Sequence, residues 1–179
     1  IIFNALRDSP TSNITTWDIS FEDLGPEIAK PLAEYITVTG SLTKLDIASN
    51  KIGPEGAKEI AKSLLVTGSL TKLDISYNHI GPQGAKAIAE MLSVTGSLTS
   101  LDLRRNDIGP QGAKAIAEML KVNAVLTTLD LSGNKLTNYG KDMTGIYAIA
   151  DALKGNGVLT TLDLSRNHMG SEASKAIAK

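Results

Sequence analysis

The sequence predicts an α/β solenoid, a fold in which short strands and helices alternate along the chain and stack unit upon unit. The first observation is an internal repeat, since residues 70–97 match residues 42–69 at 20 of 28 positions and residues 98–125 at 19 of 28. The second is that the apolar residues of each unit first alternate, as in a strand, and then recur every three or four residues, as in a helix. A unit this small cannot bury its own apolar face, so neighbouring units must stack.

Each unit begins with a short strand. In residues 70–97, Leu73 and Ile75 alternate with polar residues, which predicts a half-buried strand with these two side chains pointing inward. Asn78 then ends the strand, because its short amide can serve backbone groups in a turn. We expect Ile80 to point back into the core.

A helix completes the unit. Pro82 suits the first helical position, where the N–H that proline lacks would be unpaired anyway. The following residues place an apolar face on one side of a 3.6-residue period, formed by Ala85, Ile88, Ala89 and Leu92. The outward face is Lys86, Glu90 and Ser93. We expect Gly96 to close the helix in a left-handed conformation, and Asn123 to take that place in the next unit.

Packed helices are wider, at about 10 Å, than strands are spaced, at about 4.8 Å, so the stack must curve with its parallel sheet on the concave side and its helices on the convex side. This pattern, LxxLxLxxNxL followed by xxxGxxxLxxxL, resembles the leucine-rich repeat family, and the 28-residue length resembles its ribonuclease-inhibitor-like branch. The resemblance covers Ile14 to Lys179 and rests on Leu42, Leu45, Ile47, Asn50, Ile52, Gly56, Ile60 and Leu64. It implies a right-handed horseshoe. Members of that branch act as inhibitors, as sensing ends of immune receptors or as activators of small GTPases.

We expect residues 1–179 to be a single repeat domain, with a flank or cap remnant at residues 1–13. Repeats start at residues 14, 42, 70, 98, 126 and 159, and the last is incomplete, which suggests part of a larger chain or complex. In the first repeat Trp17 is expected to plug the end of the core. Pro31 predicts either a helix that begins near it or a kinked helix.

The repeat that starts at residue 126 is five residues longer than its neighbours, and the extra residues fall within 137–144. Insertions in a repeat array form a loop on one side, and such loops often carry recognition. The loop residues we select for a binding role are Tyr139, Lys141 and Asp142. A surface loop lengthened by drift explains the same residues.

Composition narrows the class of protein. A net charge of −1 and an isoelectric point near 6.2 argue against a nucleic-acid partner. No apolar run approaches the roughly 20 residues that span a bilayer, so no membrane insertion is expected. The sequence has no cysteine. Secreted members of the resembled family carry cysteine-bearing flanks, and we therefore expect an intracellular, cytoplasmic location.

No catalytic constellation is recognisable, and we expect neither an enzyme nor a cofactor or metal site. His79 and His168 hold the same position three repeats apart, about 15 Å at strand spacing, which is too far to share a metal. The Gly-Lys pair at residues 140–141 lacks the glycine spacing and the Ser or Thr of a phosphate-binding loop. The histidines are interpreted as exposed loop residues.

One outward strand position is aspartate in every repeat. Stacked about 5 Å apart, neighbouring carboxylates would repel by roughly 0.8 kcal/mol in water and by more near protein, so something must offset the repulsion. We expect Lys44, Lys72 and neighbouring hydroxyls, Ser76 and Ser132 among them, to form a hydrogen-bonded polar face. The alternative is an acidic strip that docks a basic partner.

Outward positions that differ between repeats are more informative, because the architecture does not dictate them. Tyr77, Arg104 and Arg105 lie on adjacent strands, and Tyr and Arg dominate binding hot spots. The alternative is that Arg104 only neutralises Asp102 and its neighbours. We expect the partner-binding surface on the concave face to comprise Lys44, Asp46, Lys72, Asp74, Tyr77, Asp102, Arg104, Arg105, Asp130, Asp163 and Arg166.

The predicted function is non-catalytic binding of a protein partner by the concave face, because a long preorganised surface suits a macromolecule better than a small ligand. Two alternatives stay open. One is a GTPase-activating protein that places Arg104, Arg105 or Asn106 at a nucleotide, and the other is a scaffold subunit of a large assembly.

Overall fold

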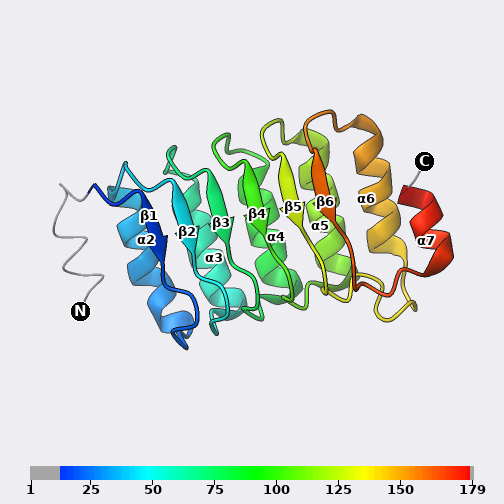
Figure 1. Ribbon diagram of the computed structural model, residues 1–179, viewed down its shortest axis with the longest axis horizontal. Helices are drawn as coiled ribbons and strands as arrows, with labels where there is room; N and C mark the ends of the chain where they lie inside the picture. The colour runs from blue at the N-terminus through cyan, green and yellow to red at the C-terminus, as the bar shows by residue number, and fades with distance from the viewer. Residues whose placement is uncertain (1–12, 178–179) are drawn as a thin grey trace.

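The computed structural model describes residues 13–177, which form a single parallel sheet with helices packed on one side (Figure 1). Within these residues six strands pair in chain order, and each strand is three residues long. They are β1 (Thr16–Asp18), β2 (Lys44–Asp46), β3 (Lys72–Asp74), β4 (Ser100–Asp102), β5 (Thr128–Asp130) and β6 (Thr161–Asp163). The predicted α/β solenoid is confirmed. The predicted flank at residues 1–13 lies, except for Asn13, outside the described residues.

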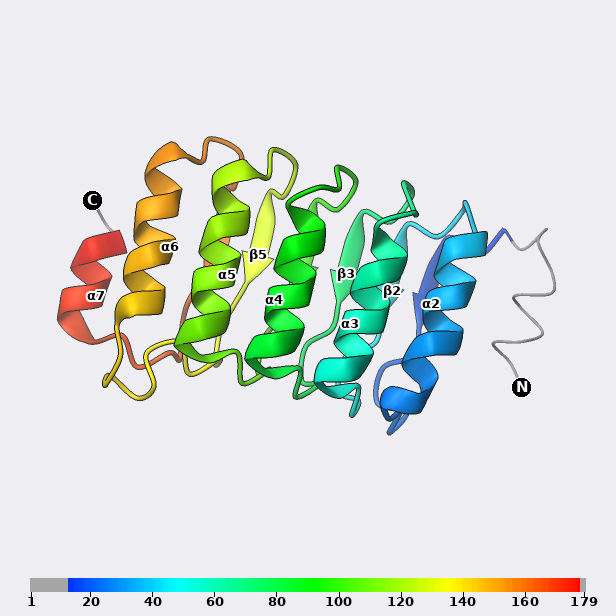
Figure 2. The same cartoon turned by 180° about the vertical axis from the view of Figure 1, so that it is seen from behind.

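The helices form the second layer, which covers one side of the sheet and leaves the other side open (Figure 2). They are the 3₁₀ helix η1 (Pro26–Ile28) and the α-helices α2 (Ala29–Val38), α3 (Gly53–Leu64), α4 (Gly81–Leu92), α5 (Gly109–Val122), α6 (Thr144–Gly155) and α7 (Gly170–Ile177). Among residues 13–177, every helix falls short of the length and apolar character needed to cross a bilayer. We call the open side of the sheet, which is the predicted concave side, the sheet face.

Strand register explains the core. Leu45, Leu73 and Leu101 are paired with one another across adjacent strands, and each is almost fully buried. Ile75 and Ile80 are fully buried as predicted. Since every second strand residue points inward, the residues between them must all point to the sheet face.

A ladder of buried asparagines joins the repeats at the turn that follows each strand. The Asn106 side-chain amide donates to the carbonyls of Ile75, Leu103 and Arg104 at 2.9–3.2 Å. Its oxygen accepts the Asn78 N–H at 2.9 Å. Equivalent bonds are made by Asn50, Asn78, Asn134 and Asn167. The predicted role of this asparagine in serving turn backbone is confirmed.

The two glycines in the first turn of α4 have different roles. Gly81 has a φ of +63°, so it holds the left-handed turn that leads into α4, and Pro82 follows it in the first helical turn. Gly84 packs against the preceding repeat, because a Cβ there would lie 2.9 Å from the Ala57 Cβ. Ridge-to-groove packing of α4 on α3 therefore needs a residue without a side chain at this position.

The expected helix ends were wrong. Gly96 is not in the left-handed region, and Asn123 is extended, with φ −75° and ψ +123°. Asn123 instead bridges backbone, since its amide donates to the Leu92 carbonyl and its oxygen accepts the N–H groups of Val125 and Leu126. The helix end is therefore closed by a side chain that bonds three backbone groups, and not by a residue in the left-handed conformation as we expected.

The first repeat closes the core as predicted. Trp17 is half-buried against the core, and its ring meets that of Tyr35 edge-on, with centroids 4.7 Å apart. Pro31 lies in the first turn of α2, which begins at Ala29, where its missing N–H costs no hydrogen bond. Of the two alternatives for Pro31, the helix that begins near it is the correct one.

Candidate protein-binding surface

Three parallel rows of side chains make up the sheet face, one per outward strand or turn position. The first row is Thr16, Lys44, Lys72, Ser100, Thr128 and Thr161, and the second is Asp18, Asp46, Asp74, Asp102, Asp130 and Asp163. The third follows the strands and is Ser20, Ala48, Ser76, Arg104, Ser132 and Ser165. Within this third row, Ser76 and Ser132 are buried.

The carboxylate row has a structural duty in every repeat. Each aspartate accepts, through Oδ1, the backbone N–H of the residue two positions later, at 2.7–3.0 Å. This bond ends the strand and turns the chain toward the helix layer. An aspartate in all six repeats therefore follows from the architecture.

Stacking the carboxylates has an electrostatic cost. Burial raises the pKa of Asp46 above its ordinary value, and the negative charges of Asp74 and Asp18 raise it further. The hydrogen bond from the Ala48 N–H opposes this rise. We expected Lys44 and Lys72 to offset the repulsion, and this was wrong. Neither lysine forms an ion pair within residues 13–177, so both ammonium groups stay exposed.

Arg104 is the cation that relieves the carboxylate row. Its guanidinium lies 2.7 Å from Asp102 and 3.4 Å from Asp130, and Nε also donates to Asp102 Oδ1 at 3.1 Å. The hydrogen bond with Asp102 raises the pKa of Arg104. Burial raises the pKa of Asp102, while bonds from Arg104 oppose the rise. The interpretation that Arg104 neutralises Asp102 and its neighbours is confirmed, yet 43% of its side chain is exposed.

Tyr77 and Arg105 form the second half of the predicted patch. The Arg105 guanidinium carbon lies 5.9 Å from the centre of the Tyr77 ring, within the range of a cation–π contact. The stem of Arg105 passes over Gly133, because a Cβ at Gly133 would lie 3.2 Å from the Arg105 Cδ. Both residues are exposed, so the contact orients the two side chains and leaves them accessible to a partner.

These side chains project from an unusual backbone. The residue before the asparagine position, which is Glu22 in the first repeat, is left-handed in all six repeats, and in five of them it is not glycine. These residues are Phe21, Ser49, Tyr77, Arg105, Gly133 and Arg166. A left-handed non-glycine residue costs about 1–2 kcal/mol, which the asparagine ladder offsets. Sequence reasoning missed this geometry. Phe21, at the same outward position of the first repeat, is 79% exposed.

The other predicted residues belong to strands on both sides of this patch. Asp163 and Arg166 belong to β6 and its turn, and no contact joins Arg166 to Tyr77 or Arg105 within the described residues. A shallow hollow of about 300 Å³ covers β1 to β4 and includes Lys44, Asp46, Lys72 and Asp74. The sheet face thus offers an open, charged depression beside the Tyr77–Arg104–Arg105 patch.

The two histidines have different surroundings. His79 Nδ1 lies 3.4 Å from Asp107, whose other oxygen pairs with Lys135 at 2.5 Å. The Lys135 bond, and then His79, lower the pKa of Asp107. The His168 ring lies against Tyr139, with centroids 5.1 Å apart. Both histidines are exposed turn residues, and residues 13–177 contain no cluster of three His, Cys, Asp or Glu that could hold a metal ion.

The insertion loop is tied to the last repeat. Thr137 is fully buried, and its hydroxyl donates to the Asn167 carbonyl at 2.7 Å and accepts the Gly140 N–H. Asp142 accepts both the N–H and the hydroxyl of Thr144 at the start of α6, and that hydroxyl lowers the pKa of Asp142. Tyr139 and Lys141 are exposed at the tip. Of the three predicted loop residues, Asp142 therefore has a hydrogen-bond partner, and Tyr139 lies against His168.

Similar proteins agree with this architecture. The family model described as "Leucine Rich repeat" matches residues 41–61, 69–89, 97–117, 122–140 and 155–178. The leiomodin-1 actin-binding site 2 is similar in structure, with a TM-score of 0.68 and 22% identity over 86% of this chain and 91% of that one. The tropomodulin C-terminal domain of Caenorhabditis elegans has a TM-score of 0.66 and 16% identity, covering 87% and 93%.

The leucine-rich repeat-containing protein LegL7 from Legionella pneumophila has a TM-score of 0.65 and 21% identity, over 96% of this chain and 57% of that one. Among curated proteins, no sequence is similar enough to count as a relative. At these identities the structural likeness concerns the fold alone.

Proposed function

We propose that this chain, which belongs to the leucine-rich repeat family, is a non-catalytic module that binds a protein partner with its sheet face. Family membership and fold support a protein-interaction module. The observation that carries the proposal is the patch formed by Tyr77, Arg104 and Arg105. These are the outward residues of the central repeats that the architecture does not require, and they are held in fixed positions by Asp102, Asp130 and the ring contact.

The patch has the properties of a binding hot spot. Tyr77 is a large, partly exposed ring with little side-chain entropy to lose, and Arg105 lies against it. Arg104 is already fixed between two carboxylates, so a partner would not have to order it. A complementary partner presents a carboxylate to Arg105 and basic side chains to Asp46 and Asp74 in the adjoining hollow.

An affinity capture from lysate of the source organism tests the proposal. The test variant combines Tyr77→Ser, Arg104→Ser and Arg105→Ser, which introduce a residue that other repeats carry at the same positions. A control variant combines Tyr147→Ser, Lys114→Ser and Lys154→Ser on the exposed surface of α5 and α6, so it loses the same number of rings and cations. The proposal requires a partner that the intact chain and the control capture and the test variant loses. A partner lost equally with both variants would contradict it.

GTPase activation remains the alternative with a defined chemistry. Asn106 is not available for it, because its side chain is fully buried and its amide is used by the turn. Arg104 would have to leave Asp102 to reach a nucleotide, which leaves Arg105 as the accessible arginine. A GTP hydrolysis assay with candidate GTPases discriminates: acceleration that Arg105→Ala abolishes would favour activation, and no acceleration favours the binding module.

A scaffold subunit of a large assembly is the other alternative, and cross-linking in source lysate separates it from a free binder. A cytoplasmic location belongs to the same proposal and rests on the absence of cysteine from the sequence. Actin is a reasonable first purified protein to test, because the description of the leiomodin-1 structure names an actin-binding site.

A further inference from the structure

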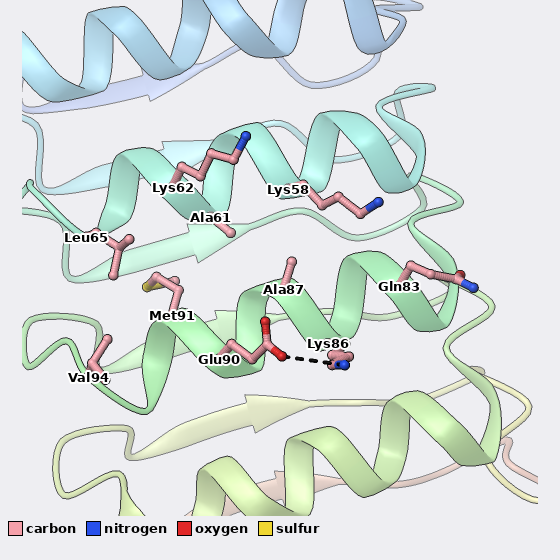
Figure 3. A pocket seen from close by; sticks show the side chains of 10 residues that line it. All are labelled: Lys58, Ala61, Lys62, Leu65, Gln83, Lys86, Ala87, Glu90, Met91 and Val94. Atoms are coloured by element: carbon pink, nitrogen blue, oxygen red, sulfur yellow. Dashed lines mark ion pairs between the residues drawn. The ribbon is translucent and has the colours of Figure 1, made fainter.

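The helix layer carries an apolar groove on the side of the molecule opposite the sheet face (Figure 3). It runs between α3 and α4, with a volume of about 650 Å³. Ala61 and Leu65 from the α3 side face Ala87, Met91 and Val94 from the α4 side. The volume is within the range of ligand-binding clefts, and the groove is open along its length to solvent.

Two residues that line this groove depart from the repeat pattern. The position of Leu65 is polar in the other repeats, where it is Thr37, Ser93, Lys121 and Lys154. The position of Lys62 is acidic in the other repeats, where it is Glu34, Glu90, Glu118 and Asp151. The repeat architecture thus accepts a polar residue at the first position and an acid at the second, so it does not explain leucine and lysine here.

The apolar surface is unusually open. Leu65 is 53% exposed and Val94 is 74% exposed, while Met91 below them is buried. A contiguous apolar strip of this kind, rimmed by polar residues, is typical of an interaction site. No part of the described chain covers it (Figure 2).

Three lysines line the rim of the groove. Lys58, Lys62 and Lys86 lie along it, with Glu90 as the acidic residue of the lining. Each lysine pairs with a glutamate of its own helix, at 2.6 Å for Lys58, 2.5 Å for Lys62 and 3.6 Å for Lys86. Exposed pairs of this type contribute only about 0.3–0.5 kcal/mol, so the lysines can exchange these partners for carboxylates of a bound ligand.

We propose that the groove binds an amphipathic helix of another protein, whose apolar stripe is flanked by aspartate and glutamate. Two parallel helices about 10 Å apart present ridges and a groove into which a third helix packs. A helix satisfies its own backbone, whereas an extended peptide would gain no main-chain bonds here, because the helices on both sides have used theirs. A second copy of the chain fits poorly, since a two-fold contact would bring two lysine-rimmed grooves together.

Fluorescence anisotropy with a synthetic peptide tests this inference. The probe is a labelled helical peptide of about 18 residues with leucine at positions i, i+3, i+4 and i+7 and glutamate beside them. The control peptide has lysine in place of glutamate. We expect saturable binding of the acidic peptide that weakens as salt increases, about fivefold weaker binding for Lys62→Glu and about tenfold for Leu65→Ser.

The control variant is Lys114→Glu, which makes the same charge change on α5, outside the groove. It should bind the acidic peptide as the unmodified chain does, and circular dichroism should be unchanged in all variants. The inference is overturned if the acidic peptide fails to bind at about 1 mM, if the lysine peptide binds equally, or if Lys114→Glu loses as much affinity. Self-association that Leu65→Ser abolishes would assign the groove to a second copy instead.

Discussion

Asp46 is a residue whose charge the fold disfavours. Because its pKa is raised, the native chain binds more protons than the unfolded chain between the ordinary value of 3.8 and the raised value. The free energy of unfolding contributed by Asp46 therefore falls as the pH increases through that window. At neutral pH the charge is a net cost, while the bond from the Ala48 N–H is a gain.

Asp46→Asn should therefore stabilise the chain at pH 7, by up to about 0.5 kcal/mol, since asparagine keeps the oxygen acceptor and removes the charge. The advantage should shrink as the pH falls toward 3.8 and should be lost below 3.8, where the aspartate is neutral in the native and the unfolded chain. Urea denaturation at both pH values measures it. Asp18→Asn is the control, because the Ser20 hydroxyl lowers the pKa of Asp18, and this change should destabilise at pH 7. Equal effects of both changes would contradict this assignment of the two carboxylates.

Asn106 is the residue on which the central turns depend. Asn106→Ala should lower the free energy of unfolding by about 3 kcal/mol, because the Asn78 N–H then lacks its acceptor in a dry site and three carbonyls lose a donor. Chemical denaturation measures the loss. His79→Ala, an exposed change in the neighbouring turn, should stay within about 0.5 kcal/mol. A similar small loss for Asn106→Ala would mean that the asparagine ladder does not stabilise the contact between repeats.

The sequence alone predicted where the recurring residues lie in the fold, because identical residues at a fixed period must occupy equivalent positions in successive repeats. The aspartate row, the asparagine turn and the inward leucines were all placed correctly. It did not predict that Tyr77 and Arg105 are left-handed, since the conformation of a non-glycine residue follows from the bonds around it and not from its own identity. It offered Arg104 as well as Lys44 and Lys72 as cations that could relieve the carboxylates, and it could not choose between them, because the choice depends on side-chain reach.

At the level of elements, the glycines show that the position of a residue in the repeat does not by itself predict its backbone conformation. We predicted a left-handed Gly96 from its place at the end of a helix, and the left-handed glycine is instead Gly81, the first residue of α4. Gly96 lies in open space, because a Cβ at this position would have its nearest neighbouring atom 3.9 Å away, whereas a Cβ at Gly84 would meet Ala57 at 2.9 Å. The two glycines should therefore respond differently to the same substitution.

Gly84→Ala should destabilise the chain by about 2 kcal/mol, since α4 must move away from α3 to admit the methyl group. Gly96→Ala should be neutral or stabilise by up to about 1 kcal/mol, because it restricts the unfolded chain without strain in the native turn. Thermal and urea unfolding of the two variants give the comparison. A larger loss for Gly96→Ala than for Gly84→Ala would show that the helix spacing is assigned wrongly.

The insertion loop is anchored by the hydroxyl of Thr137, which can be removed while the shape of that side chain is kept. Thr137→Val keeps the volume but removes the hydroxyl that bonds the Asn167 carbonyl and the Gly140 N–H. We expect a loss of about 1–2 kcal/mol and faster protease cleavage within residues 137–142. Thr161→Val, at an exposed position of β6, is the control and should change neither measurement. Unchanged cleavage in Thr137→Val would contradict the anchoring role.

For the whole molecule, the array separates two surfaces that do different things. The sheet and the helix layer lie on opposite sides of the molecule (Figures 1 and 2). The sheet face carries the patch at Tyr77, Arg104 and Arg105, and the helix layer carries the groove between α3 and α4. The period of the sequence predicted the first surface. The sequence also contains a sign of the second surface, since Lys62 and Leu65 depart from the repeat pattern. The groove that these residues line depends on how α3 and α4 pack, and that packing is visible only in the structure.

Because the two surfaces are separate, their ligands should bind independently. Saturating the groove with the acidic helical peptide should leave capture of the sheet-face partner unchanged within about twofold, since no shared residue couples the sites. Competition in the capture assay measures this. Loss of the partner when peptide is added would mean that one ligand occupies both surfaces.

The most direct test of partner binding by the sheet face is site-specific photo-cross-linking in source lysate. A photoreactive benzoylphenylalanine replaces Tyr77 on the sheet face or, in the matched chain, Tyr147 on α6; the two tyrosines are similarly exposed, at 44% and 48%. We expect a discrete protein adduct from position 77 that is absent from position 147. An adduct from position 147 and none from position 77 would contradict binding by the sheet face.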